Sequence, residues 1–532
     1  MKQTAYDLSD MPDEPRIAEN LTHCPMNGQH SCCTRLIEAD MERFARQKIE
    51  QFVQSHVVTM RNSLDEFATE FRKHFRDALR STERQLDRMF HQTYGSFYRD
   101  NSKVFSDFFD EIDEQFAVDD PSASLKSALG LLFRKIFLIE FGLMNPMRDI
   151  SNAERHCMAR LQGQLKPFGQ IPAKLALLLD RTFAIWKLTI STLEKASQLL
   201  IRLGDKMVLK PECVNKLVHM KQCHVCSGIN VKTKPCMGFC LNVLNGCFAE
   251  VAEIEPQWTG LMETLQLISS RLKSANNVYH VLAPVPIQIS EAIMLFQERG
   301  TTISNRIVFQ CFEPKMRFRR ATEESVLDRP VVVNSPDMGP SWLSESLTSL
   351  YRKGDGLKRE IGRFNDRLIL MKGAWRLLPT AICSDGQVAQ NAGEQCWNGE
   401  TTSGYKKAVV ASGINPQRYN PEFKGFNLNL SKETFIDERL SLHSLRQQLL
   451  NVFDGKSAKS ESIDASGLEE LNPDPDNPDD EDNYEGSAYS NCNDHAVMDD
   501  VKIQLLEQRS GTSRTIGCLL TSIGLFLLLR IL

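Results

Sequence analysis

The sequence lacks the motifs of several common enzyme classes. It contains no Gly-rich phosphate-binding loop, no HExxH metalloprotease motif and no GxSxG nucleophile elbow. It also lacks the face of basic residues that nucleic-acid-binding proteins present. We therefore expect a protein that is not an enzyme, that needs no cofactor or metal and that has no nucleic-acid partner.

Proline and glycine are absent from residues 29–94, and a sustained period-two alternation, typical of strands, is hard to find anywhere in the chain. Within 29–94, apolar residues recur at steps of three and four, which places them on one helical face: Met60, Leu64, Phe67, Phe71, Phe75, Leu79, Leu86 and Phe90. Similar patterns follow in 124–144, 173–204, 255–274 and 344–375. These patterns predict an all-α fold in which the stripe is the core-facing side of a long helix.

Changes in composition divide the chain into segments. Residues 313–341 combine charge and proline without helical periodicity, which predicts a protease-sensitive loop inside a helical body spanning 1–453. Between Ser460 and Asp500 there are fourteen Asp and Glu and no Lys or Arg. Such a segment buries too little apolar surface to fold, so residues 454–514 are predicted to form a disordered acidic stalk.

The last segment, 515–532, is apolar. Its seventeen-residue run from Ile516 is marginal as a membrane-spanning helix, because it is short and carries Arg530 near its end. A GPI-anchor signal, which is removed when the anchor is attached, fits this segment better than a tail-anchored span. The candidate attachment residues are Ser510, Asn493 and Ser490.

Fifteen cysteines are spread from Cys24 to Cys518. Zinc sites draw their ligands from a short span, whereas several of these cysteines stand alone and are scattered over hundreds of residues: Cys157, Cys311, Cys383 and Cys396. This distribution favours disulfides and an oxidising compartment. The first twenty residues, however, are polar and carry no secretory signal peptide. Either that segment is missing from this sequence or the secreted interpretation is wrong.

Two alternatives stay open for the denser cysteine cluster around "CHVC" and "PCMGFC". Cys223 and Cys226 could form a redox pair, although the βαβ setting of that motif is missing. His219 and His224 could instead join the neighbouring cysteines in a zinc site: Cys223, Cys226, Cys236 and Cys240.

Three kinds of modification site would suit a secreted protein. Asn20 and Asn429 stand in N-x-[ST] sequons, although two such matches arise by chance in many chains of this length. In the 313–341 loop the pattern Arg-x-Arg-Arg is one that furin-type proteases accept: Arg317, Arg319 and Arg320. A solvated charge run, or a patch for sulfated polysaccharide, is the alternative there.

The third modification site is in the stalk, where Ser466 precedes Gly467 between carboxylates. This is the acceptor pattern for xylose-initiated glycosaminoglycan chains, because glycine and disorder give a transferase access to the hydroxyl. Ser487 has acidic neighbours but is followed by alanine, so it is a weaker candidate. The alternative for both is an ordinary linker serine.

Four segments together resemble the glypicans, a family of GPI-anchored heparan sulfate proteoglycans. They are "CPMNGQHSCCT" (24–34), "FHQTYGSFYRDNSKVFSDFFDEI" (90–112), the cysteine cluster from "CVNKLVHMKQCHVC" to "EPQW" (213–258) and "ICSDGQVAQNAGEQCWNGETTSGY" (382–405). The resemblance runs from about Tyr6 to Tyr405, and the third segment is its most specific part.

The resemblance implies an elongated α-helical body stapled by disulfides, with these pairs: Cys24–Cys223, Cys33–Cys226, Cys157–Cys311, Cys213–Cys247, Cys236–Cys396 and Cys240–Cys383. The last two pairs would cross the protease-sensitive loop, so a chain cut after Arg320 would stay one covalent particle. Family members carry one further cysteine near the N-terminus. A truncation there would explain its absence, and that of the signal peptide, and would leave Cys32 unpaired.

The function implied by the resemblance is that of a non-catalytic cell-surface proteoglycan. It would lie on the outer leaflet of the plasma membrane through a GPI anchor, and would also be shed to the extracellular space. As a co-receptor it would regulate secreted growth factors and morphogens of the Wnt, Hedgehog, BMP and FGF type, together with their receptors. Covalently attached heparan sulfate would concentrate basic ligands by long-range attraction.

Two other functions are kept as alternatives. One is a GPI-anchored structural or adhesive ectodomain without glycosaminoglycan chains. The other is an intracellular zinc-binding scaffold, which only the missing signal peptide favours.

Overall fold

The computed structural model describes residues 16–17, 21–25, 30–118, 125–312, 341–386, 388–390, 395–425 and 428–454. The chain divides into two compact units, Met1–Ala458 and Lys459–Leu532, and every described residue belongs to the first. The predicted acidic stalk from residue 455 onward, the apolar end and the loop at 313–340 lie outside the described residues.

The described part of the chain is all-α, as predicted, apart from one two-residue ribbon in which β1 (Arg16–Ile17) pairs antiparallel with β2 (His30–Ser31). The longer helices are α1 (Arg35–Asn101), α2 (Lys103–Ala117), α3 (Leu125–Met144), α4 (Asn152–Leu165), α5 (Ile171–Lys206), α9 (Glu255–Lys273), α11 (Val285–Glu298), α12 (Gly300–Cys311), α13 (Ser341–Met371) and α15 (Ile436–Phe453). The shorter ones are α6 (Pro211–Lys221), α7 (Cys223–Cys226), α8 (Met237–Cys247), α10 (Val278–Leu282), α14 (Leu378–Cys383) and the 3₁₀ turns η1 (Val251–Ile254), η2 (Asn415–Tyr419) and η3 (Pro421–Phe423).

Helix α1 carries the stripe predicted from the sequence. Thr34 caps it by accepting a hydrogen bond from the Ile37 N–H at 3.4 Å, and the acidic Glu38 lies in its first turn. Every residue of the predicted stripe, from Met60 to Phe90, is buried. The stripe is therefore confirmed as a core-facing surface.

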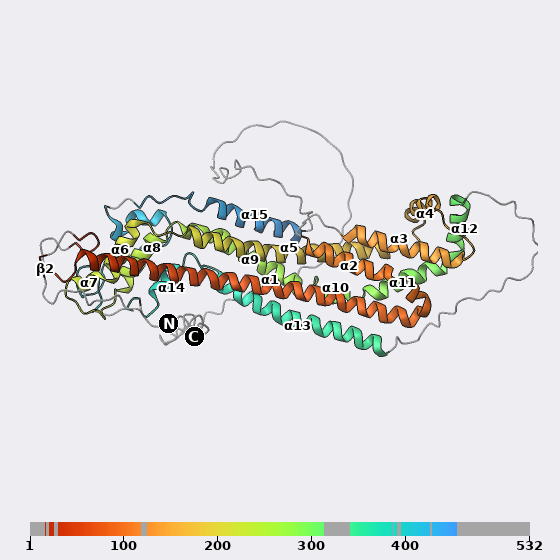
Figure 1. Ribbon diagram of the computed structural model, residues 1–532, viewed down its shortest axis with the longest axis horizontal. Helices are drawn as coiled ribbons and strands as arrows, with labels where there is room; N and C mark the ends of the chain where they lie inside the picture. Colours follow the sequence, from red (N-terminus) through yellow and green to blue (C-terminus); the bar gives the residue numbers. More distant parts are fainter. Residues whose placement is uncertain are drawn as a thin grey trace, which may run out of the picture. The chain divides into compact units, whose positions relative to one another are not determined.

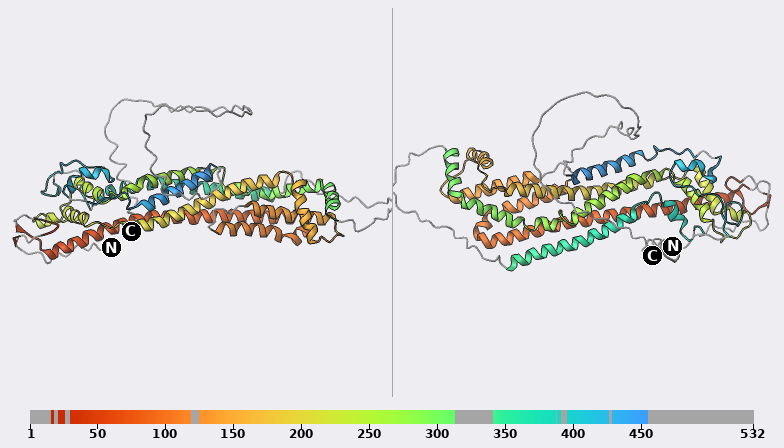
Figure 2. Two further views of the ribbon diagram at one scale, coloured as in Figure 1. Left: turned by 90° about the horizontal axis from the view of Figure 1, so that it is seen from above. Right: turned by 180° about the vertical axis from the view of Figure 1, so that it is seen from behind.

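Long helices run side by side along α1 (Figures 1 and 2). Aromatic rings from three of them meet in the core: the Phe71 ring of α1 lies 5.8 Å from Trp186 of α5 and 5.2 Å from Phe364 of α13. Edge-to-face pairs of this kind add about 0.5–1.5 kcal/mol each beyond their apolar burial. Packing between helices that are distant in sequence thus forms this bundle, which we call the long-helix bundle (α1, α5, α9 and α13).

The described helices were also compared with the requirements of a membrane span. No single one of them is long and apolar enough to cross a bilayer. The segments Met237–Cys247 and Val251–Leu282 meet the requirements of length and composition only as a pair, and that pair is bent by 71°.

Candidate functional site

The cysteines gather mainly at one end of the described body, around α6, α7, α8 and α14 (Figure 1). Six disulfides form, in the pairs that the resemblance implies: Cys24–Cys223, Cys33–Cys226, Cys157–Cys311, Cys213–Cys247, Cys236–Cys396 and Cys240–Cys383. All but Cys157–Cys311, which joins α4 to α12 at the opposite end, lie in this region, which we call the cysteine-rich end. The disulfides of this end connect residues that are 34 to 199 positions apart in the sequence, so covalent bonds hold its segments together.

These pairs exclude both alternatives for the cysteine cluster. Cys223 and Cys226 bond to Cys24 and Cys33 rather than to each other, so they are not a redox pair, and the sulfur atoms proposed as zinc ligands are all in disulfides. Within the described ranges, no group of three or more His, Cys, Asp or Glu could hold a metal ion. The zinc and redox interpretations are therefore wrong.

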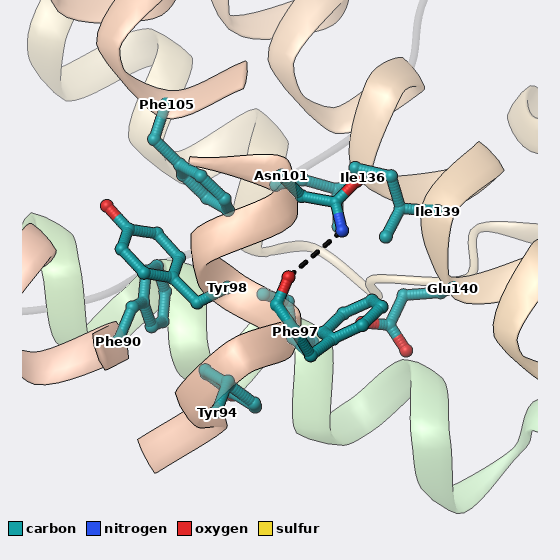
Figure 3. Close-up of a pocket in the computed structure, with 10 residues that line it drawn as sticks. Phe90, Tyr94, Phe97, Tyr98, Asn101, Phe105, Ile136, Ile139 and Glu140 are labelled. Atoms are coloured by element: carbon teal, nitrogen blue, oxygen red, sulfur yellow. Dashed lines mark hydrogen bonds between the residues drawn. The ribbon is translucent and has the colours of Figure 1, made fainter. Parts of the chain in front are cut away.

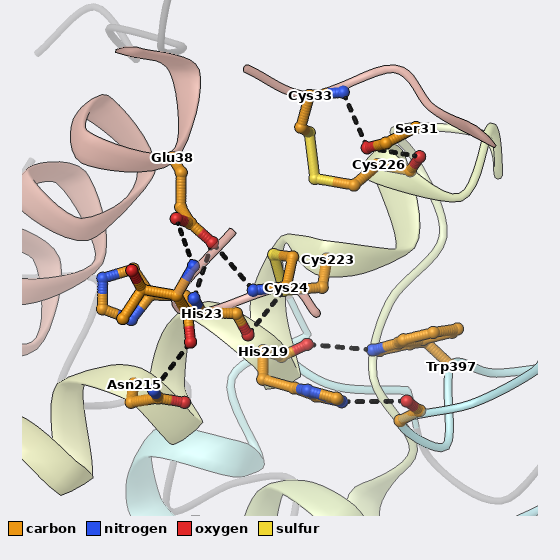
Figure 4. The surroundings of a disulfide bond; sticks show 12 residues. His23, Cys24, Ser31, Cys33, Glu38, Asn215, His219, Cys223, Cys226 and Trp397 are labelled. Atoms are coloured by element: carbon orange, nitrogen blue, oxygen red, sulfur yellow. Dashed lines mark hydrogen bonds between the residues drawn. A yellow bond between two sulfur atoms is a disulfide. The ribbon is translucent and has the colours of Figure 1, made fainter. Parts of the chain in front are cut away.

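The two histidines of that cluster have structural roles. His219 donates from Nε2 to the Gly399 carbonyl at 2.9 Å, while the Trp397 indole donates to the His219 carbonyl at 3.1 Å (Figure 4). Burial lowers the pKa of His219 to about 4 and that of His224 to about 4. Both rings are thus neutral at physiological pH, and they pack against the segment that Cys396 ties down.

The carboxylate of Glu38 fastens the N-terminal segment to α1. It accepts three backbone N–H groups, from Thr22 at 2.8 Å, His23 at 2.6 Å and Cys24 at 2.8 Å (Figure 4). Glu38 is only 4% exposed, so these bonds satisfy a charge that burial would otherwise penalise. The Cys24–Cys223 disulfide then joins the same segment to α7.

Two buried amides of α8 perform a similar task for the segment that follows Cys396. Asn242 donates to the Tyr405 hydroxyl at 2.7 Å and to the Ala408 carbonyl at 2.9 Å, and its oxygen accepts from the Val410 N–H at 2.9 Å. Asn245 donates to the Val410 carbonyl at 2.8 Å. Sequence reasoning missed these residues, because an asparagine between apolar positions of a cysteine-rich helix gives no sign of the segment that it contacts.

The sequence predicted several modification sites, of which most lie outside the described residues: Asn20, Arg317, Arg319, Arg320, Ser466, Ser487, Ser490, Asn493 and Ser510. Asn429 is described; its side chain is exposed and its backbone carbonyl accepts from Lys210 at 2.9 Å. Its glycosylation stays a prediction. Among the described cysteines, Cys32 has no disulfide partner, and it is half-buried beside Cys226, whose carbonyl accepts from the Cys32 N–H at 3.1 Å.

One cavity lies away from the cysteine-rich end, where α1, α2, α3 and α11 meet (Figure 3). Helix α1 bends there, because Gly95 adopts φ 56° and ψ −126°, a conformation that L side chains rarely accept. Because of the bend, the parts of α1 before and after Gly95 line the same cavity, which has a volume of about 30 Å³. We call it the aromatic pocket, and its lining residues are Phe90, Tyr94, Phe97, Tyr98, Asn101, Phe105, Ile136, Ile139, Glu140 and Ile293.

Glu140 is the acidic group of this otherwise mostly apolar lining. Its side chain is 4% exposed, and it accepts a hydrogen bond from Gln297 at 3.3 Å. Desolvation raises its pKa to about 7, and the bond from Gln297 opposes the shift only in part. The aromatic pocket therefore holds a carboxyl group that changes charge near physiological pH.

Comparison with known proteins places the chain in a family. The family model described as Glypican matches residues 1–518. The chain is similar to glypican-1 of Gallus gallus, with 26% identity over 418 residues that cover 78% of this chain and 72% of the relative. It is also similar to glypican-5 of Homo sapiens, with 24% identity over 425 residues, 78% of this chain and 70% of the relative.

Solved structures show the same fold. The glypican-1 core protein superposes with a TM-score of 0.69 at 23% identity, covering 85% of this chain and 96% of that one. Dally-like protein, solved in complex with O-palmitoleoyl serine, superposes with a TM-score of 0.62 at 26% identity, again covering 85% and 96%.

Proposed function

The chain belongs to the glypican family, and from that premise we propose that it is the core protein of a co-receptor that regulates secreted growth factors and morphogens of the Wnt, Hedgehog, BMP and FGF type. Glypicans are heparan sulfate proteoglycans that generally act at the cell surface. The observation that carries the proposal is the family match over residues 1–518, and the disulfide-bonded helical body supports it. We assign the protein no catalytic role.

In this proposal the functional groups are spread along the chain. Ser466 carries a heparan sulfate chain, Ser487 is a weaker acceptor, and a GPI anchor at Ser490, Asn493 or Ser510 holds the protein on the outer leaflet. The sulfated chain attracts basic ligands over the Debye length, about 8 Å at physiological ionic strength, and so raises their local concentration.

Cleavage after Arg320 would not release either part of the body. Cys236 and Cys240 precede the 313–340 segment, while their partners Cys396 and Cys383 follow it. The Cys157–Cys311 bond, by contrast, lies wholly before that segment. Two disulfides would therefore keep a cleaved protein in one piece, and reduction after cleavage should separate it into two fragments on a gel.

The test of the proteoglycan assignment uses the full chain expressed in an animal cell line. We expect the wild-type protein to migrate as a high-mass smear that heparinase collapses to a sharp band, and Ser466→Ala to abolish most of that smear. Ser462→Ala, in the same acidic stalk but without a following glycine, is the matched control. A wild-type protein without any heparinase-sensitive smear would favour the adhesive ectodomain instead.

A second, finer proposal concerns an acylated partner. Dally-like protein was solved with O-palmitoleoyl serine, and the aromatic pocket of this chain offers the apolar lining that an acyl chain requires. Its volume of about 30 Å³ admits about one methyl group or water, so side chains at its mouth, such as half-buried Phe97, must rotate to admit more.

Filling the pocket tests this second proposal. Ile139 lines the pocket and is only half-buried, so Ile139→Trp should block the pocket while preserving the fold. We expect it to weaken binding of O-palmitoleoyl serine by about tenfold or more, a loss of about 1.4 kcal/mol. The control is Ile369→Trp, at a position of α13 that is 56% exposed and outside the pocket. Equal binding by both variants would remove the aromatic pocket from the proposal.

A further inference from the structure

A second cavity lies between α1 and α13, which run side by side in Figure 1 and in the right-hand view of Figure 2. Its volume is about 370 Å³, and we call it the cationic cleft: Ser81, Arg84, Gln85 and Arg88 of α1 with Ser349, Leu350 and Lys353 of α13. The lining contains three cationic side chains and no carboxylate. The size falls in the usual range for small-molecule sites, roughly 300–1,000 Å³.

The polar group that points to a ligand is Gln85. Its residue is 4% exposed, and neither Nε2 nor Oε1 has a hydrogen-bond partner within the described part of the chain. A buried amide without partners costs roughly 1–3 kcal/mol for each unsatisfied group, and native proteins rarely keep one without a reason. Its place in the wall of an open cleft means that a bound molecule can supply the missing partners.

Arg84 leaves positive charge facing the cleft. The Lys353 ammonium bonds to Asp77 at 2.8 Å and to Ser81 Oγ at 3.0 Å, so Asp77 neutralises this lysine. The Arg84 guanidinium donates only to neutral groups, the Arg80 carbonyl and Ser81 Oγ, both at 3.2 Å. No carboxylate among the described residues forms an ion pair with Arg84, whose side chain is exposed.

Arg80, in contrast to Arg84, forms ion pairs with acidic side chains. Arg80, one helical turn before Arg84, bonds to Glu83, Asp110 and Asp113, at 2.9 to 3.2 Å. The charge of Arg80 is therefore neutralised within the fold, by Glu83 of α1 and by Asp110 and Asp113 of α2. Arg84 extends from the same helix without an ion pair to any of the described acids and can turn its planar donors toward an anion.

We propose that the cationic cleft binds, non-covalently, a saccharide or other polyol that carries sulfate or phosphate esters. The ester oxyanion is recognised by Arg84, since a guanidinium group matches two oxygens of such an anion. A hydroxyl of the polyol pairs with Gln85, whose amide both donates and accepts. Leu350 and the arginine stems offer apolar surface to the C–H faces of the ring. The site is independent of any chain attached at Ser466.

Binding is tested on the full chain after heparinase treatment, by calorimetric titration with two probes. One is a heparin-derived sulfated tetrasaccharide and the other is inositol hexakisphosphate. We expect at least one probe to bind, with an affinity that falls as salt is raised. Arg84→Gln should weaken binding by about tenfold or more, as loss of a charge-assisted bond does. The matched control is Arg367→Gln, an exposed arginine fourteen residues beyond Lys353 on α13, or about 21 Å along the helix.

Gln85→Leu separates recognition from folding. It replaces an unpartnered buried amide by an apolar side chain of similar size, so thermal stability should stay the same or rise while binding weakens. A higher affinity for the tetrasaccharide identifies a sulfated saccharide as the ligand class, and a higher affinity for inositol hexakisphosphate identifies a phosphorylated polyol. Either result supports the site. The proposal is overturned if neither probe binds, or if Arg84→Gln and Gln85→Leu bind as well as Arg367→Gln does.

Discussion

The cysteine-rich end and the long-helix bundle are stabilised by different interactions. In the cysteine-rich end, five disulfides and buried polar side chains such as Glu38 and Asn242 hold short helices and irregular segments in place. In the bundle, rings such as Phe71 and Trp186 fill the space between long helices without covalent links. Short segments bury too little apolar surface to be ordered by packing alone, which is why covalent bonds concentrate there.

The largest effect should come from emptying the bundle core. Phe71 is fully buried and contacts Trp186 and Phe364, so Phe71→Ala leaves a cavity that long, rigid helices cannot easily close. We expect the free energy of unfolding to fall by about 3–5 kcal/mol, measured by denaturant titration under non-reducing conditions. Phe309→Ala is the control, because that ring is 87% exposed, and it should change the value by less than about 0.5 kcal/mol. Similar losses for both variants would mean that the packing of Phe71 does not stabilise the bundle.

The cysteine-rich end should respond most to its disulfides. Cys240 and Cys383 are fully buried and join α8 to α14, 143 residues away. The double variant Cys240→Ala with Cys383→Ala should lose about 2–5 kcal/mol, and hydrogen exchange should rise in α8 and α14 while the middle of α1 stays protected. The corresponding double variant of Cys157 and Cys311 should instead loosen α4 and α12. Uniform exchange over the whole body in either variant would argue against separate stabilisation of the two regions.

Glu140 of α3 lies outside the long-helix bundle and places a buried carboxyl group among aromatic rings. Its pKa of about 7 lies above its value in an unfolded chain, so the folded state holds the proton more tightly. The stability contributed by the protonated form is therefore complete below about pH 4.5 and is lost as the pH rises to about 7, after which the loss is constant.

Glu140→Gln should remove that pH dependence. The variant should be more stable than the wild type at pH 8, by at most about 3 kcal/mol, and the two should converge near pH 4. Thermal unfolding between pH 4 and 8 measures the difference, with the exposed Glu114→Gln as the control. Parallel curves for the wild type and Glu140→Gln would show that Glu140 does not titrate in this range.

The sequence predicted the bundle better than the cysteine-rich end. The stripe from Met60 to Phe90 can be recognised in the sequence, because helical periodicity is a property of one segment. Its burial could therefore be predicted as well. The residue pairs of the disulfides came only through the resemblance, since spacing does not encode connectivity. Asn242, Gln85 and the bend at Gly95 could not be predicted, because their roles depend on which distant segments they meet.

The smallest expected effect is that of a change at Glu38, which holds the same N-terminal segment as the Cys24–Cys223 disulfide does. Its carboxylate accepts three N–H groups from residues 22–24, and Cys24 is also bonded to Cys223. Glu38→Gln keeps the shape of the side chain but replaces one acceptor oxygen by an NH₂ group that faces backbone donors. We expect a loss of about 1–3 kcal/mol and faster exchange of those three amides, with Glu66→Gln, an exposed residue of the same helix, as the control. If the disulfide alone ordered this segment, the exchange of the three amides would not change. Faster exchange with the Cys24–Cys223 bond intact would mean that the disulfide only limits how far the segment can move. The buried carboxylate would then determine where the segment lies.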